Sequence, residues 1–429
     1  MKKKFNLKNI RGNLRVPGDK SISHRAVMLS SISKGIAQID NLLESEDVLS
    51  TINIFKECGI EISKAGKTYY INGKGLYGLK EPENILNVNN SGTTIRIVSG
   101  ILGAQGFISV LTGDNSIRHR PMKRIITPLS KMGIKIYGRK NNNYPPLTII
   151  GNKNIKAIKY KSPVASAQVK SAILFAGLYA SGKVIVEEPF KSRDHTEMMF
   201  DYFNIPIKIK DNKIILNNRR REIISKNIYV PGDISSAAYF IVAGLLGGND
   251  RIRINDVGLN LTRRQIINVL RRMGANIFIT NVRIKNNEQI GDIVVRKSKL
   301  KATEIFPEEI PKLIDDIPIL SIAAASAEGI TRIRGARELR VKESDRIKSI
   351  VYNLKNLGVE VKEYEDGFDI KGVKKLKSNK MIKTFNDHRI AMSFIIASIL
   401  TDKGLILDRV DSIKTSYPGF LSDIRKVSN

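Results

Sequence analysis

Cationic and hydroxyl side chains recur in short runs where helices are expected to start. The run G-D-K-S-I-S-H-R places Lys20 at a turn, and Ser21 and Arg25 lie four residues apart on one helical face. The run R-V-K-E-S-D-R gives Lys342 and Arg346 the same spacing. Free backbone N–H groups and the helix dipole favour anions at such starts. These runs therefore indicate phosphate or carboxylate binding, and the alternative is a capped helix with a solvated charged face.

Three further runs also contain residues that are suited to binding anions. The run N-N-S-G-T-T contains Gly92, which allows the backbone to approach an oxyanion closely. Arg120 precedes a proline that is expected in the first turn of a helix. The run N-D-H-R puts Arg389 at a helix start, and Lys414 follows in a loop. Asp315, in D-D-I-P-I-L, is either an ordinary N-cap or a chemically active carboxylate.

The elements that carry these runs are repeated along the chain. The tetrapeptide V-P-G-D occurs at 16–19 and again at 230–233, an offset of 230 − 16 = 214 in a chain of 429 residues. Two copies at half the chain length indicate an internal duplication. We interpret the two turns as the points where the chain crosses between two domains.

Within each half, an apolar helix that ends in glycine occurs three times. Such helices should be buried, with the glycine as the C′ cap, and each should lead into a strand and a second, amphipathic helix. Examples of the second helix are 120–133 and 344–358, both of which run into strands. The expected caps are Gly35, Gly106, Gly182, Gly248, Gly329 and Gly404.

This organisation predicts an α/β protein of two pseudo-symmetric domains, each with three repeated βαβαββ-type units and buried helices. One domain is expected to comprise residues 1–18 and 233–429, and the other residues 19–232.

Composition limits the classes of protein that the chain can represent. A hydrophobic content of 42% with 26% charged residues is typical of globular proteins. The apolar run at 392–400 is shorter than the roughly 20 residues of a membrane helix. The single cysteine, Cys58, fits a reducing compartment, so we expect a cytoplasmic protein that does not enter a membrane. The net charge of +31 suggests nucleic acid, but the basic residues are scattered, so nucleic acid is not an expected partner.

Taken in order, the five charged and glycine-containing runs resemble those of the 5-enolpyruvylshikimate-3-phosphate synthases, within the enolpyruvyl transferases. The resemblance covers nearly the whole chain and implies an inside-out barrel fold. It implies transfer of the enolpyruvyl group of phosphoenolpyruvate to the 5-hydroxyl of shikimate 3-phosphate, with release of phosphate. It also implies no metal and no organic cofactor. We expect the protein to be a monomer. In that family the herbicide glyphosate competes for the phosphoenolpyruvate site.

The resemblance further implies a role for each matching residue. Shikimate 3-phosphate would contact Lys20, Ser21, Arg25, Ser166, Gln168, Asp315 and Lys342. Phosphoenolpyruvate would contact Lys20, Gly92, Arg120, Gln168, Arg346, Arg389 and Lys414. Asp315 would be the base for the hydroxyl, and either Glu343 or Lys20 would protonate the methylene carbon. The seven cations of these sets would match the roughly five to six negative charges of two phosphorylated acids without a metal.

Two positions depart from the family pattern. Ala167 stands where many relatives carry a second serine, and His195 stands where some carry tyrosine. We interpret all four histidines, His24, His119, His195 and His388, as orienting or structural groups rather than catalysts.

Two other functions fit parts of the sequence. UDP-N-acetylglucosamine enolpyruvyl transferases use a loop cysteine near the equivalent of 113–122, a segment that contains none here. The second rival, a polyanion-binding protein without activity, rests on the net charge alone.

Overall fold

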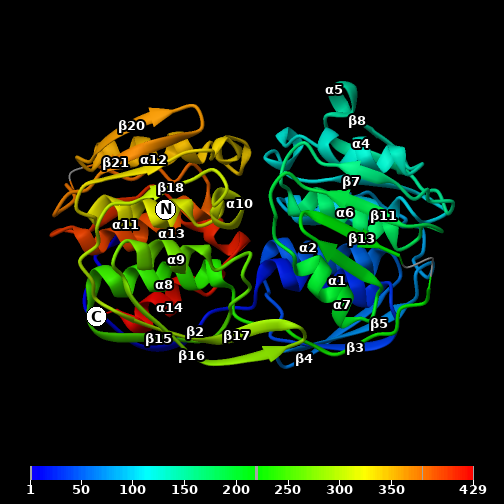
Figure 1. The fold of residues 1–429 in the computed structure, drawn as a ribbon, viewed down its shortest axis with the longest axis horizontal. Coiled ribbons are helices and arrows are strands. Elements are labelled where there is room, and N and C mark those ends of the chain that lie inside the picture. The colour runs from blue at the N-terminus through cyan, green and yellow to red at the C-terminus, as the bar shows by residue number, and fades with distance from the viewer. Residues whose placement is uncertain (1, 218–220, 379, 429) are drawn as a thin grey trace. The chain divides into compact units, whose positions relative to one another are not determined.

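The computed structural model describes residues 2–217, 221–378 and 380–428 (Figure 1). The chain forms two compact units. Unit 1 comprises residues 1–17, 231–284 and 288–429, and unit 2 comprises residues 18–230 and 285–287. The V-P-G-D turns lie where the chain passes from one unit to the other. The assignment of residues 285–287 to unit 2 adds a further passage that the two-turn interpretation did not anticipate.

Unit 2 contains three four-stranded sheets of one pattern, in which a parallel pair is followed by two antiparallel neighbours. The strands, in sheet order, are β14 (Ile228–Tyr229), β3 (Lys34–Asp40), β5 (Thr68–Lys74) and β4 (Glu61–Ala65); β6 (Leu86–Asn87), β7 (Ile108–Thr112), β9 (Tyr144–Ile150) and β8 (Lys135–Gly138); and β10 (Lys159–Lys161), β11 (Val184–Glu187), β13 (Lys213–Leu216) and β12 (Ile207–Lys210).

Unit 1 repeats the four-stranded order twice, and its third repeat differs. In the last repeat β1 pairs antiparallel with β22, and Ile382 forms a parallel bridge to Leu407. The prediction of six equivalent repeats is therefore wrong for the last one, whose sheet uses the N-terminal strand. The strands are β16 (Asn276–Lys285), β17 (Glu288–Arg296), β15 (Gly248–Gly258) and β2 (Ile10–Arg15); β18 (Glu304–Ile305), β19 (Ile330–Ile333), β21 (Gly367–Lys371) and β20 (Glu360–Tyr364); and β1 (Lys3–Phe5) with β22 (Leu405–Leu407).

Six apolar helices fill the interiors of the units, as predicted. In Figure 1, the three of unit 1 lie between the sheet of β2, β15, β16 and β17 and the strands β20 and β21. The six helices are α1 (Lys20–Ser31), α3 (Gly92–Leu102) and α6 (Ala167–Gly177) in unit 2, and α8 (Ile234–Gly247), α11 (Ile317–Ser326) and α13 (His388–Ala397) in unit 1. Across the described residues the sheets stay separate and no closed barrel is formed, but the mixed α/β class is confirmed.

The second helices pack outside these six. They are α2 (Glu46–Glu57), α4 (Lys123–Lys131), α7 (His195–Tyr202), α9 (Gln265–Arg272), α12 (Arg346–Asn356) and α14 (Phe420–Val427). The remaining short turns are α5 (Arg139–Asn142), α10 (Ile310–Leu313), η1 (Ile117–His119), η2 (Arg337–Val341), η3 (Ser398–Leu400) and η4 (Asp411–Thr415).

The predicted glycine caps are wrong. Helix α1 ends at Ser31, so Gly35, with a φ of 100°, lies in the following strand. Gly329 and Gly404 have positive φ and directly precede the next strand, while Gly248 is the C-cap of α8 but has extended rather than left-handed backbone. Apart from Gly248, the glycines lie beyond the helix ends, because the helices are shorter than their apolar runs. Gly106 and Gly182 lie in loops beyond α3 and α6.

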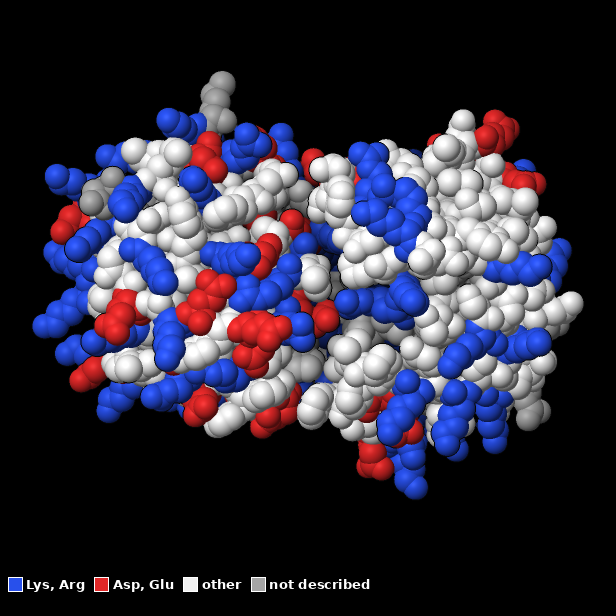
Figure 2. Space-filling model, turned by 90° about the horizontal axis from the view of Figure 1, so that it is seen from above, with Lys and Arg blue, Asp and Glu red and all other residues white. Residues whose placement is uncertain are grey.

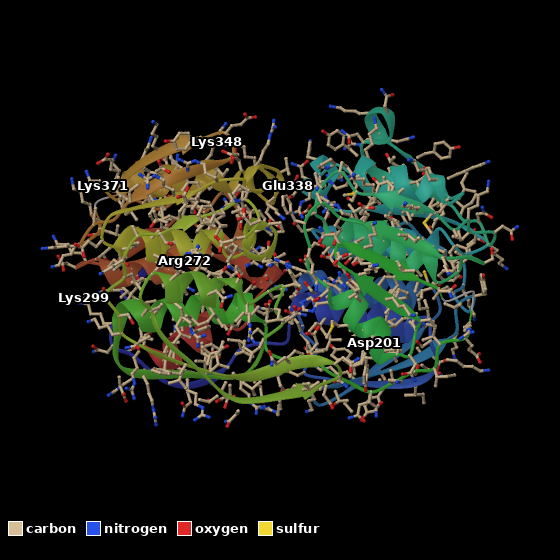
Figure 3. All side chains as sticks on the ribbon, viewed as in Figure 1. Asp201, Arg272, Lys299, Glu338, Lys348 and Lys371 are labelled. Atoms are coloured by element: carbon tan, nitrogen blue, oxygen red, sulfur yellow. The ribbon has the colours of Figure 1, made fainter. Side chains whose placement is uncertain are left out.

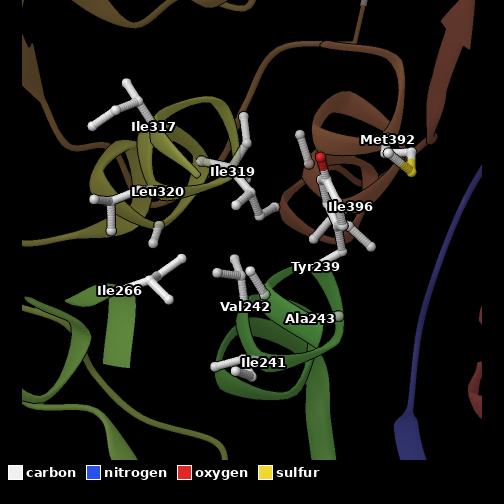
Figure 4. Packing of buried hydrophobic residues seen from close by; sticks show 14 of the residues in the cluster. Tyr239, Ile241, Val242, Ala243, Ile266, Ile317, Ile319, Leu320, Met392 and Ile396 are labelled. Atoms are coloured by element: carbon white, nitrogen blue, oxygen red, sulfur yellow. The ribbon is translucent and has the colours of Figure 1, made fainter. Parts of the chain in front are cut away.

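The core of unit 1 is formed where its three apolar helices meet. Figure 4 shows side chains from α8, α11 and α13 converging, among them Val242, Ile319 and Ile396. All three are fully or almost fully buried. These helices are apolar on nearly all sides, and the charged runs lie at the starts of α11 and α13.

The tip of the β16–β17 hairpin is fixed by contacts within unit 2. Asn286 and Asn287 both have positive φ, as a two-residue hairpin turn requires. The Tyr229 backbone N–H donates to Asn286 Oδ1 at 2.8 Å, and the Asn287 amide donates to Asp201 at 2.9 Å. Lys285 Nζ lies 3.7 Å from the centre of the Tyr229 ring.

Many charged side chains lie on the outside of the units. In Figure 3, Lys299 and Lys371 point away from unit 1. On the face seen in Figure 2, Lys and Arg of unit 1 are interspersed with Asp and Glu rather than gathered in one stripe. In the described residues, no helix is both long and apolar enough to span a bilayer.

The close contact of α3 with α6 generates a stability prediction. A Cβ on Gly100 would overlap the backbone oxygen of Ala172 on α6. We expect Gly100→Ala to lower the free energy of unfolding by about 1–3 kcal/mol, because overpacking outweighs the better helix propensity of alanine. Urea denaturation measures the change, with Lys355→Ala on the exposed face of α12 as the matched control. A variant as stable as the wild type would refute the close contact.

Candidate active site

The start of α1 in unit 2 gathers the first predicted cluster. Asp19 caps the helix by accepting from the Ile22 N–H at 2.9 Å. Lys20 Nζ lies 3.0 Å from Asp47 Oδ2 on α2. Arg25 is buried, and its Nη1 donates to the backbone oxygen of Ser21 at 2.9 Å. The structure therefore places Lys20, Ser21 and Arg25 together, as the sequence predicted, and adds the carboxylate of Asp47.

The starts of α3 and α6 are joined by a residue that sequence reasoning missed. Ser166 is the N-cap of α6 and accepts from the Val169 N–H at 3.4 Å. Arg96 on α3 donates to Gln168 Oε1 at 2.5 Å, and Gln168 Nε2 donates to Thr93 Oγ1 at 3.0 Å. Arg96 follows Gly92 by four residues, so the i, i+4 spacing used for Arg25 could have identified it.

Arg120 lies beside Gly92, although not where the sequence placed it. Arg120 is the residue that ends η1, and α4 begins only at Lys123, so Pro121 lies outside the helix rather than in its first turn. Arg120 Nη2 donates to Asn90 Oδ1 at 2.6 Å. A Cβ built on Gly92 would lie 3.0 Å from Arg120 Nη1 and 3.1 Å from Arg96 Nη1.

In unit 1, Arg346 is the centre of the second cluster. It is the first residue of α12, whose N-cap Asp345 accepts from the Lys348 N–H at 3.0 Å. Its side chain is 1% exposed. Arg346 Nε lies 2.8 Å from Asp387 Oδ2, Nη2 lies 2.5 Å from Glu343 Oε2, and Nη1 lies 3.5 Å from Asp315 Oδ1.

Arg389 completes this cluster from the first turn of α13. Its Nη1 donates to the backbone oxygen of Asp315 at 2.7 Å and lies 3.7 Å from Asp316 Oδ1. Burial alone would lower the pKa of the Arg389 guanidinium, but the carboxylates of Asp315 and Asp316 raise it above its usual value. The cation is thus permanently charged at the helix start.

The other two predicted cations of unit 1 lie on short turns. Lys342 follows η2 and adopts an extended backbone, so it does not share a helical face with Arg346, contrary to the i, i+4 interpretation. Lys414 lies in η4, which packs against α13, the helix of Arg389.

The carboxylates change the predicted charge balance. Three of the seven predicted cations lie beside acidic groups that the sequence count left out: Lys20 beside Asp47, and Arg346 and Arg389 beside Asp315, Asp316, Glu343 and Asp387. The positive charge of these three cations is therefore largely compensated within the protein. A doubly charged ligand at Arg346 has to compete with Glu343 and Asp315, rather than meet an uncompensated positive charge.

His24 is a buried histidine that contacts a threonine of the neighbouring helix. It is buried in α1 with Nδ1 2.7 Å from Thr51 Oγ1. Burial, together with Lys20 and Arg25, holds its pKa well below the usual value, so the imidazole is neutral at pH 7. Thr51 Oγ1 in turn lies 2.7 Å from Thr94 Oγ1, which links α1 to the start of α3 through α2.

The Asp387–Arg346 pair yields a pH-dependent prediction. Burial alone would raise the pKa of Asp387, but Arg346 more than offsets this, and the pKa lies below its usual value. The pair therefore stabilises the fold above the unfolded-state pKa of about 4, and this contribution is lost as the pH falls through the folded-state value. We expect Asp387→Asn to cost about 3–5 kcal/mol at pH 7.

Urea denaturation from pH 7 to pH 3 measures this cost, which should shrink below about pH 4. Asp369→Asn, at the more exposed pair with Arg334, is the control and should cost less. A cost for Asp387→Asn that is the same at every pH would contradict the ion-pair explanation.

Comparison with known proteins identifies the family of this chain. The family model "EPSP synthase (3-phosphoshikimate 1-carboxyvinyltransferase)" matches residues 6–424. The 3-phosphoshikimate 1-carboxyvinyltransferase of Petrotoga mobilis is 49% identical over 420 residues, which are 98% of this chain and 97% of the relative. The EPSP synthase structure from Acinetobacter baumannii is 40% identical with a TM-score of 0.89, over 100% of this chain and 98% of that one. The enolpyruvyl transferase NikO from Streptomyces tendae shares the fold at 14% identity, with a TM-score of 0.81 over 100% of this chain and 97% of that one. The chain therefore belongs to the EPSP synthase family.

Proposed function

We infer that this chain transfers the enolpyruvyl group of phosphoenolpyruvate to the 5-hydroxyl of shikimate 3-phosphate and releases phosphate. This is a transferase reaction of the shikimate pathway, which leads to the aromatic amino acids. The observation that carries the inference is the surroundings of Arg346. A fully buried guanidinium is bracketed by Asp315 and Glu343, the two carboxylates that family membership makes candidates for proton transfer.

Shikimate 3-phosphate is assigned to residues of both units. In unit 2, Arg25 and Lys20 supply charge, and the N-cap Ser166 and Gln168 lie at the half-buried start of α6. Arginine suits a phosphate because its planar fork donates two parallel hydrogen bonds. The full proposed set is Lys20, Ser21, Arg25, Ser166, Gln168, Asp315 and Lys342.

Phosphoenolpyruvate is assigned in the same way. Arg120 beside Gly92, and Gln168 held by Arg96, supply the unit 2 contacts. Arg346, Arg389 and Lys414 supply those of unit 1, and Lys20 contacts both substrates. Because Arg346 already binds three carboxylates, we propose that the anionic substrate replaces Glu343 or Asp315 on one of its N–H groups and so releases that carboxylate for proton transfer.

The proposed chemistry has two steps. Asp315 removes the proton of the 5-hydroxyl as its oxygen attacks C2 of phosphoenolpyruvate, while Glu343 or Lys20 delivers a proton to the methylene C3. In the second step C3 loses a proton and the C2–O bond to phosphate breaks. Proton transfer by a positioned group contributes about 10²–10⁴-fold to such a rate.

Three further statements belong to this proposal. We propose that the protein acts in the cytoplasm, which the single buried Cys58 supports, and that it acts as a monomer. We also propose that the two units correspond to the domains 19–232 and 1–18 plus 233–429. Nucleic acid is not proposed as a partner, because the basic residues are scattered along the chain, and on the unit 1 part of the face seen in Figure 2 acidic side chains lie among them.

A phosphate-release assay with shikimate 3-phosphate and phosphoenolpyruvate at neutral pH tests the function. Turnover should require both substrates and should persist after exhaustive chelation. The proposed absence of a metal requirement is wrong if chelation abolishes turnover and a divalent ion restores it. A chain that binds polyanions but releases no phosphate would favour the polyanion-binding alternative.

Asp315→Asn tests the assignment of the base. We expect kcat to fall by about 10²–10⁴-fold with smaller changes in both Michaelis constants, because the amide cannot accept the proton. The backbone oxygen that binds Arg389 is retained in this variant, so the helix start should keep its geometry. A change confined to the Michaelis constants would reassign Asp315 to substrate positioning.

Gly92→Ala tests the phosphoenolpyruvate site. The wild type should be inhibited by glyphosate, which is longer than phosphoenolpyruvate. The added methyl would lie 3.0 Å from Arg120 Nη1, so the guanidinium has to shift and both ligands should bind less well. We expect the inhibition constant to rise by the larger factor, since the longer ligand has less room. Equal factors, or an insensitive wild type, would refute this account.

A further inference from the structure

Lys170 is a charged residue inside an apolar helix. It lies in the first half of α6, its side chain is 1% exposed, and its neighbours in the sequence are mostly small or apolar. Its Nζ lies 2.8 Å from Glu188 Oε2 and 2.7 Å from Glu197 Oε1, and both carboxylates are equally buried. An ammonium group at this depth requires such partners, since an unpaired buried charge is very unfavourable.

The two carboxylates belong to the two ends of one segment. Glu188 directly follows β11, and Glu197 lies in the first turn of α7. The Glu188 carboxylate also accepts from Ser192 Oγ at 2.6 Å and from the Ser192 N–H at 3.3 Å. Lys170 therefore binds both ends of the segment that leads from β11 into α7 and holds that segment against α6.

Lys170, Glu188 and Glu197 form a buried triad. Residues adjacent to this triad in the sequence make a second contact between α6 and α7. Ser171 follows Lys170, and Thr196 precedes Glu197. Their hydroxyl oxygens lie 2.6 Å apart. The guanidinium of Arg25 meets both, with Nε 2.7 Å from Thr196 Oγ1 and Nη2 2.7 Å from Ser171 Oγ.

The direction of these hydrogen bonds follows from the number of protons. The Ser171 hydroxyl donates its only proton to the Ala167 backbone oxygen at 2.6 Å, so it accepts from Thr196 and from Arg25. Thr196 therefore donates to Ser171, and its oxygen accepts from Arg25 Nε. The Arg25 position depends on both hydroxyls, and so on the alignment of α6 with α7.

We propose that the buried triad of Glu188, Lys170 and Glu197 positions Arg25. It holds α7 against α6 so that Ser171 and Thr196 together orient the guanidinium toward the phosphate or carboxylate of its substrate. The triad itself does not touch substrate. The inference rests on the proposed assignment of Arg25 to shikimate 3-phosphate.

Glu197→Leu and Glu197→Gln test the proposal as a pair. Leucine removes the link between Lys170 and α7, but leaves Lys170 paired with Glu188, so no buried charge is orphaned. We expect the Michaelis constant for shikimate 3-phosphate to rise by about 10- to 100-fold, since small displacements of a positioning group have effects of that size. The Michaelis constant for phosphoenolpyruvate should change little. Glutamine, which retains an oxygen for Lys170, should restore most of the affinity.

A structural role alone would give a different result. Asp369→Asn, in unit 1, is the control for a lost carboxylate partner and should lower the melting temperature without changing either Michaelis constant. Direct binding of shikimate 3-phosphate to the full-length variants, measured by calorimetry, replaces kinetics if turnover is too slow. The proposal is overturned if Glu197→Leu lowers only the melting temperature, if both Michaelis constants rise equally, or if glutamine fails to rescue.

Arg25→Ala separates this failure from a failure of the proposed function. If Arg25→Ala leaves the affinity for shikimate 3-phosphate unchanged, the assignment of Arg25 is wrong. If Arg25→Ala weakens that affinity and Glu197→Leu does not, the assignment of Arg25 stands and only the positioning role is lost.

Discussion

A buried cation has to be surrounded by compensating groups, and most of the site depends on this constraint. Arg346 has three carboxylates within 3.5 Å, Lys170 has two within 2.8 Å, and Arg25 has two hydroxyls and a backbone oxygen. Most of these partners come from another helix or from a helix start, and Glu188 directly follows β11. The cations thus join helices that are otherwise held by apolar packing, and the same contacts hold the donors ready for an anionic substrate.

The fold was largely predictable because its signals are local and repeated. The V-P-G-D duplication and the apolar helices, such as α8 and α13, specified the α/β class and the positions of the helices. The glycine caps were wrong because an apolar run does not mark where a helix ends, as Gly35 in β3 shows. The prediction for the last repeat was wrong because the sheet of that repeat uses β1. This strand lies about 400 residues away in the chain, and no local pattern identifies it as a partner.

The site was predictable where the residues are adjacent in the sequence, as for Lys20, Ser21 and Arg25. The balancing carboxylates were missed because Asp47 and Asp387 are ordinary in the sequence and become significant only through contacts between helices. Lys170 was a visible anomaly in an apolar run, but its partners could not be inferred from spacing. Arg120 lies farther from a helix start than predicted, because Pro121 precedes α4 rather than lying in its first turn.

The pairing of β1 with β22 constrains the order in which the chain can fold during synthesis. Apart from residues 285–287, unit 2 is one continuous stretch of chain, so its sheets can form while the ribosome is still translating. Unit 1 cannot complete its sheets at that stage, because strands made first, β1 and β2, pair with β22 and β15, which are made later. The first strands to be synthesised therefore stay unpaired until some of the last residues have been made. Because these pairings close longer loops, the loss of chain entropy is larger for unit 1, and unit 1 is the slower of the two to form.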